Sequence, residues 1–174
     1  MPRTNRILAG TLVIFCCAVA IARATPIVGL LFANILASGN TQEEIAVHVK
    51  VPLPPGSVPN DDDDTWTAKF LTSGPTTVTV QDVEYVPGGH TGWHSHPGVL
   101  VSSVTQGSIE WYDSQCVKHV YNVGDALTES TEPHYVRNVG TLNARFMVTY
   151  ILAKGQPRRI DQPAPACAAA LGLE

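Results

Sequence analysis

Two histidines separated by one residue, His94 and His96, have the types and spacing that best permit chemistry in this chain. Side chains two positions apart in an extended strand project from the same face, so both imidazoles would point to one side of a sheet. A later histidine, His134, could add a third nitrogen. Imidazole is the commonest protein ligand for zinc, copper, nickel and iron. The pattern therefore predicts a metal site formed by three histidines.

The segments that must position these histidines have the pattern of short β-strands. They are rich in Val, Thr, Ile and Tyr, and several alternate apolar with polar residues. Gln106-Gly107 marks a tight connection, and no segment after residue 24 sustains a helical period. We therefore expect an all-β sandwich or barrel. The expected strands are Gly29–Ala37, Ile45–Val51, Thr67–Leu71, Thr77–Val86, Val99–Thr105, Ser108–Tyr112, Lys118–Val123, Tyr135–Val139 and Ala144–Leu152.

Residues 1–24 have the pattern of a secretory signal peptide. Arg3 and Arg6 precede an apolar run, and Ala22-Arg23-Ala24 predicts cleavage after Ala24. The alternative is an uncleaved membrane anchor, which needs about 20 unbroken apolar residues. Arg23 and Pro26 interrupt the run. We expect a secreted or periplasmic protein that has no membrane contact once the segment is removed.

Removal of that segment would make the chain more acidic. The full sequence has a formal charge of −4, and loss of the three arginines Arg3, Arg6 and Arg23 lowers it to −7. Such a charge, without a cluster of Lys or Arg, argues against a nucleic-acid partner. Residues 25–75 are expected to hold N-terminal strands and an acidic loop, and residues 76–174 a barrel with a C-terminal tail.

The acidic loop contains four consecutive aspartates, Asp61–Asp64. Calcium sites space their carboxylates and include a turn glycine, so this run predicts a solvated loop instead. Two of the four cysteines would leave with the signal peptide, and Cys116 and Cys167 would remain. An even number of cysteines in an exported protein favours a disulfide, with two free thiols as the alternative.

The spacing of several residues resembles the two motifs of the cupin superfamily. In the first motif a glycine is followed by five residues, His-x-His, a glutamate and a second glycine. The second motif contains a glycine, then a histidine, three residues and an asparagine. The residues at these positions are Gly88, His94, His96, Gly107, Gly124, His134 and Asn138. The resemblance covers about residues 76–152 and is to the small exported single-domain members of the superfamily.

This resemblance implies a jelly-roll barrel, also called a double-stranded β-helix, with additional N-terminal strands. It implies that His94, His96 and His134 bind one divalent transition metal. It also implies that Asn138 tightens the strand behind the third ligand, and that the protein forms a homodimer. Val99 and Val101 would face away from the core, so the N-terminal strands or a second copy would have to cover them.

The chain departs from the family pattern in both motifs. In the second, the stretch between Gly124 and His134 is one residue short and lacks the internal glycine. The departure in the first motif bears directly on the metal site. The glutamate of the first motif falls at Leu100, and a shift of two residues either way gives Gly98 or Ser102. We therefore expect three imidazoles without an anion, which favours iron, nickel, copper or zinc over manganese and favours an anionic ligand. Glu132 is a possible replacement, because it lies two residues before the third histidine. Pro133 makes regular strand pairing there doubtful.

Candidates for an acid or base are few. His90, Glu132 and Tyr112 are the residues that could reach the site, and an exposed position is the alternative for His90. His48 and His119 lack ligand-type neighbours and are expected at the surface. Trp93 has the parity opposite to the histidine pair and is expected to pack.

Three classes of function remain open on the sequence. The first is a metalloprotein that binds a small-molecule ligand without turnover. The second is an enzyme, either a three-histidine non-haem iron dioxygenase or an isomerase, that acts on a small anionic substrate. The third is a structural or interaction barrel without metal.

Overall fold

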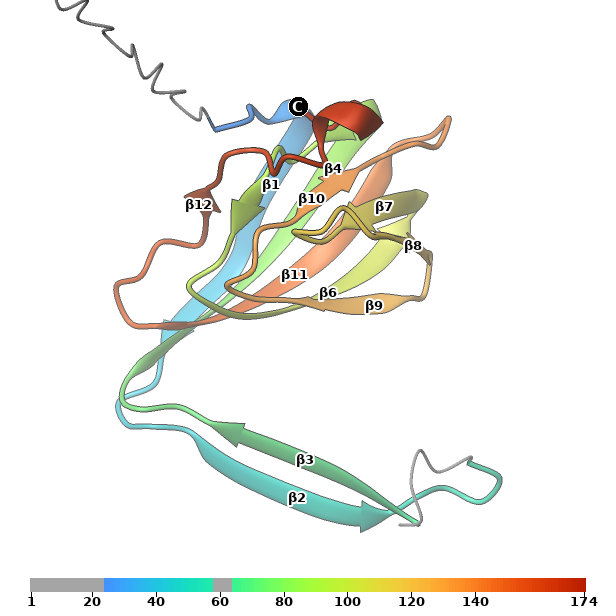
Figure 1. The fold of residues 1–174 in the computed structure, drawn as a ribbon. Coiled ribbons are helices and arrows are strands. Elements are labelled where there is room, and N and C mark those ends of the chain that lie inside the picture. Colours follow the sequence, from blue (N-terminus) through green and yellow to red (C-terminus); the bar gives the residue numbers. More distant parts are fainter. Residues whose placement is uncertain (1–23, 58–63) are drawn as a thin grey trace, which may run out of the picture.

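The computed structural model describes residues 24–57 and 64–174, and over these ranges the regular secondary structure is almost entirely β-strand (Figure 1). The predicted signal peptide and the aspartate run lie outside the described residues, apart from Ala24 and Asp64. The strands are β1 (Val28–Asn40), β2 (Ala46–Pro52), β3 (Thr65–Leu71), β4 (Thr76–His90), β5 (His94–Ser95), β6 (Gly98–Gln106), β7 (Ser108–Tyr112), β8 (Lys118–Asn122), β9 (Ala126–Glu129), β10 (Tyr135–Arg137), β11 (Ala144–Ala153) and β12 (Ile160–Asp161). A short 3-10 helix, η1 (Ala169–Leu171), precedes the end of the chain.

An antiparallel sheet of eight strands forms the wall of the barrel. Its order is β8-β7-β10-β4-β11-β6-β9, and β1 pairs with β4 outside this path. The long strand β4 pairs with β11 on one edge and with β1 on the other. At its end, His90 of β4 pairs with Arg137 of β10, so the sheet curls round and nearly closes (Figure 1). The all-β jelly-roll prediction is confirmed.

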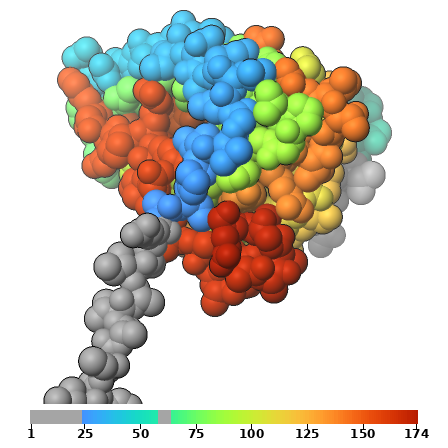
Figure 2. Space-filling view, turned by 90° about the horizontal axis from the view of Figure 1, so that it is seen from above, coloured from blue at the N-terminus to red at the C-terminus, as the bar shows by residue number. Residues whose placement is uncertain are grey.

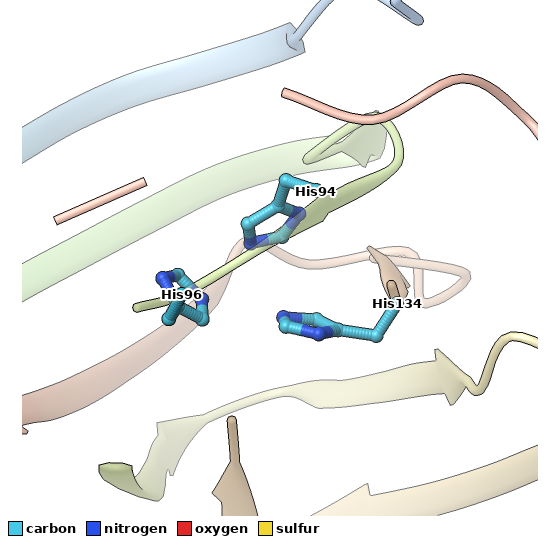
Figure 3. Close-up of side chains that lie close together, drawn as sticks. All are labelled: His94, His96 and His134. Atoms are coloured by element: carbon cyan, nitrogen blue, oxygen red, sulfur yellow. The ribbon is translucent and has the colours of Figure 1, made fainter. Parts of the chain in front are cut away.

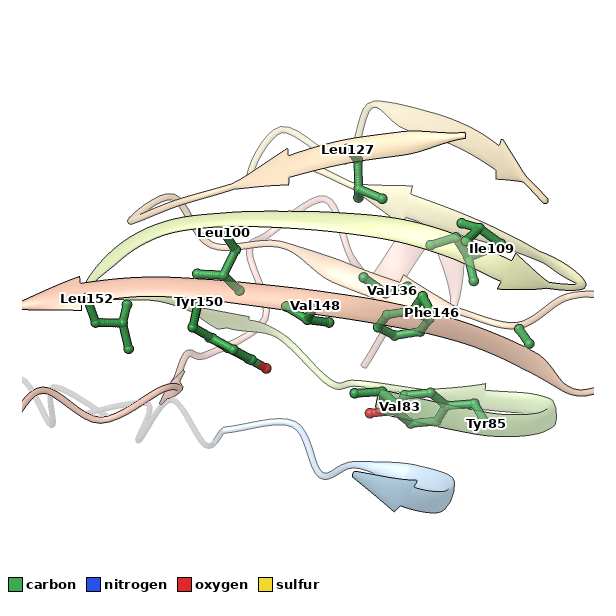
Figure 4. Packing of buried hydrophobic residues seen from close by; sticks show 12 residues of the cluster. Val83, Tyr85, Leu100, Ile109, Leu127, Val136, Phe146, Val148, Tyr150 and Leu152 are labelled. Atoms are coloured by element: carbon green, nitrogen blue, oxygen red, sulfur yellow. The ribbon is translucent and has the colours of Figure 1, made fainter. Parts of the chain in front are cut away.

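Alternation along the strands fills the barrel. In β6, Leu100, Ser102 and Val104 are buried, whereas Val99 and Val101 face outward. A buried Leu or Ile contributes about 2 kcal/mol relative to an exposed one, so these inward positions hold the wall together. The core cluster, seen from close by in Figure 4, consists of Val83, Tyr85, Leu100, Val104, Ile109, Leu127, Val136, Ala144, Phe146, Val148, Tyr150 and Leu152.

The N-terminal strands are present but do not cover the outward face of β6. Strand β1 lies along β4, and β2 and β3 form a separate two-stranded hairpin that extends from the barrel (Figure 1). Val99 and Val101 remain 43% and 41% exposed. Of the two alternatives for covering these side chains, the N-terminal strands or a second copy, the N-terminal strands leave them exposed. Strand pairing explains why the outward face of β6 stays exposed. Strand β1 is paired along its length with the edge of β4, so it does not lie over β6.

The C-terminal segment closes one end of the barrel. Cys167 forms the predicted disulfide with Cys116. Trp93 is fully buried, and its indole nitrogen donates a 2.7 Å hydrogen bond to the Leu173 carbonyl, which confirms that this residue packs. In Figure 2 the first described residues, in blue, lie beside the red C-terminal segment. Within the described ranges, no helix has the length and apolar character needed to cross a membrane.

Candidate metal site

Backbone pairing places two of the histidines side by side. The amide of His94 donates to the carbonyl of His134 at 3.0 Å, and the amide of His134 donates back to the carbonyl of His94 at 2.8 Å. Residues paired in this way lie directly opposite each other, with both side chains on one face. The two imidazole centroids are accordingly 4.3 Å apart.

A turn at Gly92 directs the chain at His94 into the barrel. Gly92, between β4 and β5, has φ +67°, and a β-carbon there would collide with the backbone carbonyl of Thr25. Only glycine meets both conditions without strain. His96 follows directly after β5 and lies on the same side as His94, as the alternation predicts, with ring centroids 4.8 Å apart.

The three imidazoles converge in the interior (Figure 3). His94, His96 and His134 are 5%, 3% and 1% exposed. One ring nitrogen from each lies within 4.8 Å of the others. The structure therefore brings together the three histidines that the sequence singled out.

Hydrogen bonds orient all three rings. The Nδ1 atoms of His94 and His134 bond to the carbonyls of Gly92 and Glu132 at 3.0 and 2.9 Å, and Nδ1 of His96 bonds to the Arg158 carbonyl. A carbonyl only accepts, so each Nδ1 carries the proton and each Nε2 keeps its lone pair. This tautomer leaves Nε2 free to bind a metal.

Two of these nitrogens are buried without a hydrogen-bond partner among the described residues. Nε2 of His96 and Nε2 of His134 form no hydrogen bond with any described residue. An unsatisfied buried polar atom costs about 1–3 kcal/mol, and a bound divalent metal would satisfy both. The donor set also suits the metal, because borderline divalent ions prefer imidazole nitrogen. The residues present therefore fit a metal ion.

Burial keeps the three imidazoles neutral. It lowers the pKa of His96 and of His134 to about 4, and lowers the pKa of His94 well below its ordinary value. The neighbouring imidazoles and the Arg159 guanidinium act in the same direction on His94. Neutral imidazoles bind metal without first releasing a proton.

A carboxylate lies beside the histidines, and the sequence analysis did not identify it. Glu129 of β9 is 9% exposed. Its Oε1 lies 3.4 Å from Nε2 of His134, and its Oε2 lies 3.7 Å from Nε2 of His96. The sequence led us to expect three imidazoles alone, and the structure places a carboxyl group beside them, whose pKa is raised by burial. The glutamate enters from the strand that pairs with β6, where Glu129 is the register partner of Leu100.

The other candidate residues lie elsewhere. The Glu132 side chain is exposed, and its contribution is the carbonyl that orients His134. The hydroxyl of Tyr112 donates to Glu110 at 2.7 Å, and His90 stacks on Tyr135 with centroids 5.1 Å apart. None of the three candidate side chains lines the cavity described next.

The expectations for three other residues are confirmed. Nδ2 of Asn138 donates to the carbonyls of Tyr85 and Leu142 at 3.1 and 2.8 Å, so it tightens the strands behind the third histidine. His48 and His119 are exposed.

A cavity of about 270 Å³ opens beside the imidazoles. His94, His96 and Glu129 form part of its lining, and most of the remainder is apolar. Burial raises the pKa of Tyr150, another lining residue, to about 12, so its hydroxyl is protonated at neutral pH. The volume is near the lower end of the range for small-molecule sites.

Two arginines also line this cavity. Arg159 donates from Nη2 to the Thr91 carbonyl at 2.8 Å and from Nε to Asp161 at 2.6 Å, which fixes its guanidinium. The guanidinium of Arg158 lies 6.0 Å from the centroid of the Tyr150 ring. Both arginines lie immediately before β12, which pairs with β5. The cavity therefore joins nitrogen donors, a carboxylate and fixed positive charge.

A comparison with known protein families identifies the part of the chain that contains the candidate site. The model of the family described as "Cupin domain" matches residues 81–150. This range contains all three histidines and Glu129. No curated protein matches the sequence.

Several solved structures resemble the fold at low sequence identity. An uncharacterized conserved protein with a double-stranded beta-helix domain from Klebsiella pneumoniae is 17% identical, with a TM-score of 0.43, over 49% of this chain and 75% of that one. An oxalate oxidase in complex with the substrate analogue glycolate is 20% identical, with a TM-score of 0.42, over 56% of this chain and 57% of its own. The DMSP lyase DddQ from Ruegeria pomeroyi is 16% identical, with a TM-score of 0.44, over 49% of this chain and 43% of its own.

Proposed function

Residues 81–150 are a cupin domain, and on that premise we propose that the protein binds one divalent transition metal through Nε2 of His94, His96 and His134. One observation carries the proposal. Backbone carbonyls hold the proton on each Nδ1, and the Nε2 atoms of His96 and His134 are buried without a hydrogen bond to any described residue. Iron, nickel, copper and zinc are all compatible with imidazole donors.

We further propose that a small-molecule ligand occupies the cavity next to the metal. The lining supports this, because three of its residues belong to the site and much of the rest is apolar. A bound metal would act as a Lewis acid toward an oxygen of such a ligand. Arg159, held by Asp161 and the Thr91 carbonyl, favours a ligand with a negative charge.

Elemental analysis of native protein purified without an affinity tag tests the metal. We expect about one metal per chain, retained in a His48→Gln control and reduced at least tenfold in His134→Gln. His48 is an exposed histidine on the hairpin strand β2, away from the site. Absence of metal from native protein, together with failure to take up added iron, nickel, copper or zinc, would contradict the proposal and favour a metal-free structural barrel.

A second candidate function is catalysis, and the arginines of the cavity favour it. They would hold a small anionic substrate beside the metal, as a three-histidine iron dioxygenase or an isomerase would need. The test is oxygen consumption by the iron-loaded protein with diketones, thiols and phenolic acids. Turnover that weakens in Arg159→Gln chiefly through a higher KM would support an enzyme. No turnover with any substrate class, while the ligand still binds, would support a binding protein.

We infer that the protein is exported after cleavage behind Ala24. The pattern of residues 1–24 supports this, and the Cys116–Cys167 disulfide is typical of oxidising compartments. Protein recovered from outside the cytoplasm should begin at Thr25 on N-terminal sequencing. A chain that still begins at Met1 would contradict the inference.

We also propose a homodimer. The support is apolar surface that the chain leaves open, including Val99 and Val101 on β6 and Trp66 and Leu71 on β3. Light scattering coupled to size-exclusion chromatography should give twice the chain mass at micromolar concentration. A single chain mass across the accessible concentration range would contradict this proposal.

A further inference from the structure

We propose that Glu129 is the fourth protein ligand of the metal, so that the site has three histidine nitrogens and one carboxylate oxygen. This inference rests on the metal binding proposed above. Glu129 lies on β9, whereas the glutamate of the family motif would lie on β6, at position 100. The structural basis is that Glu129 is the register partner of Leu100 across strands β6 and β9.

The distances fit shared coordination. Oε1 is 3.4 Å from Nε2 of His134, and Oε2 is 3.7 Å from Nε2 of His96. Ligand atoms about 2.1 Å from one ion lie roughly 3.0 Å apart in octahedral geometry and roughly 3.4 Å apart in tetrahedral geometry. The separation from His134 matches the tetrahedral value, and the separation from His96 is a few tenths of an ångström longer.

The burial of Glu129 supports its role as a metal ligand. The Glu129 side chain is 8% exposed, and its hydrogen-bond and ion-pair partners among the described residues are Trp111, His96 and His134. A carboxylate placed among neutral groups in the interior carries a large desolvation cost. A divalent cation between the carboxylate and the imidazoles would offset that cost and would also satisfy the two unpaired Nε2 atoms.

Strand alternation explains how the glutamate reaches the interior. In β9 the burial pattern alternates, so Leu127 and Glu129 both face inward. Directly opposed residues on one face of an antiparallel pair have β-carbons about 4.5–5.5 Å apart. A carboxylate can therefore reach the same space from Glu129 as from position 100, where the sequence has a fully buried leucine.

Coordination by Glu129 would change the metal preference. One carboxylate lowers the net charge of a divalent site from about +2 to about +1 and adds a hard oxygen donor. Manganese and iron thereby become more favourable than they would be with three imidazoles alone. The metal site would keep a net positive charge, so it would still attract an anionic ligand in the cavity beside Arg159.

The test compares Glu129→Gln with the exchange variant Leu100→Glu/Glu129→Leu, which moves the carboxylate to the opposed position. Competitive titration should show manganese and cobalt binding at least about tenfold weaker in Glu129→Gln, with recovery to within a few-fold of the native value in the exchange variant. The visible spectrum of bound Co²⁺ should change in Glu129→Gln, because one ligand is lost. The control is Glu44→Gln, an exposed glutamate before β2, which should match the native protein.

The outcomes separate this inference from the proposed function. If His134→Gln abolishes binding but Glu129→Gln keeps the native affinity and Co²⁺ spectrum, Glu129 is not a ligand and the three-histidine site stands. If Glu132→Gln weakens binding instead, the exposed glutamate is the ligand and this inference is wrong. If the native protein takes up no metal, the proposed function itself fails. Should Glu129→Gln not fold, native-like affinity and spectrum in the exchange variant would support the inference, and their absence in a folded exchange variant would overturn it.

Discussion

Trp111 donates an indole hydrogen bond of 3.1 Å to Oε1 of Glu129, the same oxygen that lies 3.4 Å from Nε2 of His134. The Trp111 ring also stacks on the His134 ring, with centroids 5.8 Å apart and an interplanar angle of 21°. One side chain of β7 thus orients both the carboxylate and the third imidazole. Residues that fix metal ligands in this way commonly change metal affinity by about 10–100-fold when they are replaced.

Replacement of Trp111 by Phe keeps an aromatic ring and removes the N–H donor. We expect the Glu129 carboxylate to lose its fixed orientation, so the dissociation constant for metal should rise by about tenfold. Titration against a chromophoric chelator measures this change. Trp66→Phe is the matched control, because Trp66 is 53% exposed on the hairpin. Equal affinity in the two variants would show that the indole hydrogen bond does not support the site.

Replacement of Leu100 by Glu adds a second carboxylate opposite Glu129. Without metal, two buried like charges should lower the free energy of unfolding by several kcal/mol (on the order of 3). Manganese should then stabilise the variant more than it stabilises the native protein, because hard oxygen donors are added. Thermal unfolding with and without manganese measures both effects. An unchanged metal preference would mean that position 100 does not face the site.

The Cys116–Cys167 disulfide closes a loop between residues separated by 51 positions. Titration of denatured, unreduced protein should detect no free thiol. In the loop-entropy description, a disulfide across such a loop stabilises the fold by about 4 kcal/mol, so Cys116→Ser/Cys167→Ser should lose up to that amount in urea unfolding. Two titratable thiols in the native protein would contradict the pairing.

The hydrogen-bonded cluster around Glu110 should make the stability of the fold fall at acidic pH. Burial alone would raise the pKa of Glu110, but hydrogen bonds from Tyr112, Lys118 and Arg137 outweigh it and lower the pKa to about 2. The folded state therefore favours the ionised carboxylate. Its stabilising contribution is present above the unfolded pKa of about 4.5 and is lost as the pH falls toward 2.

The variant Glu110→Gln should remove this contribution. We expect a loss on the order of 2 kcal/mol at pH 7 and a flatter dependence of the unfolding free energy between about pH 5 and pH 2. Urea unfolding at a series of pH values measures both quantities, with the exposed Glu44→Gln as control. An identical pH dependence in Glu110→Gln and the native protein would rule out this cluster as the cause.

Local alternation made much of the site predictable. The parity of residues 93–96 correctly placed His94 and His96 on one side and Trp93 on the other. The expected strands match nine of the twelve observed, with ends that differ by a few residues. The strand pattern predicted an all-β sandwich or barrel, and the even number of cysteines predicted the disulfide. The jelly-roll topology was implied by the resemblance to the cupin superfamily.

The role of β9 was not predictable in the same way. Its four residues are too few to show a periodicity, and an inward glutamate contradicts the usual rule that charged residues face solvent. The register that sets Glu129 opposite Leu100 depends on long-range pairing, which a single sequence does not specify. The sequence does hold one signal for Glu129. It lies two residues after Leu127, so both side chains share one face of the strand, and it lies five residues before the candidate ligand His134.

The proposed coordination requires the three Nε2 atoms to hold one metal ion. The decisive experiment is an anomalous difference map from crystals of the metal-loaded protein, collected at the absorption edge of the bound metal. We expect one peak per chain, about 2.0–2.2 Å from Nε2 of His94, His96 and His134. A fully loaded protein whose anomalous peak lies away from these nitrogens would rule out this coordination.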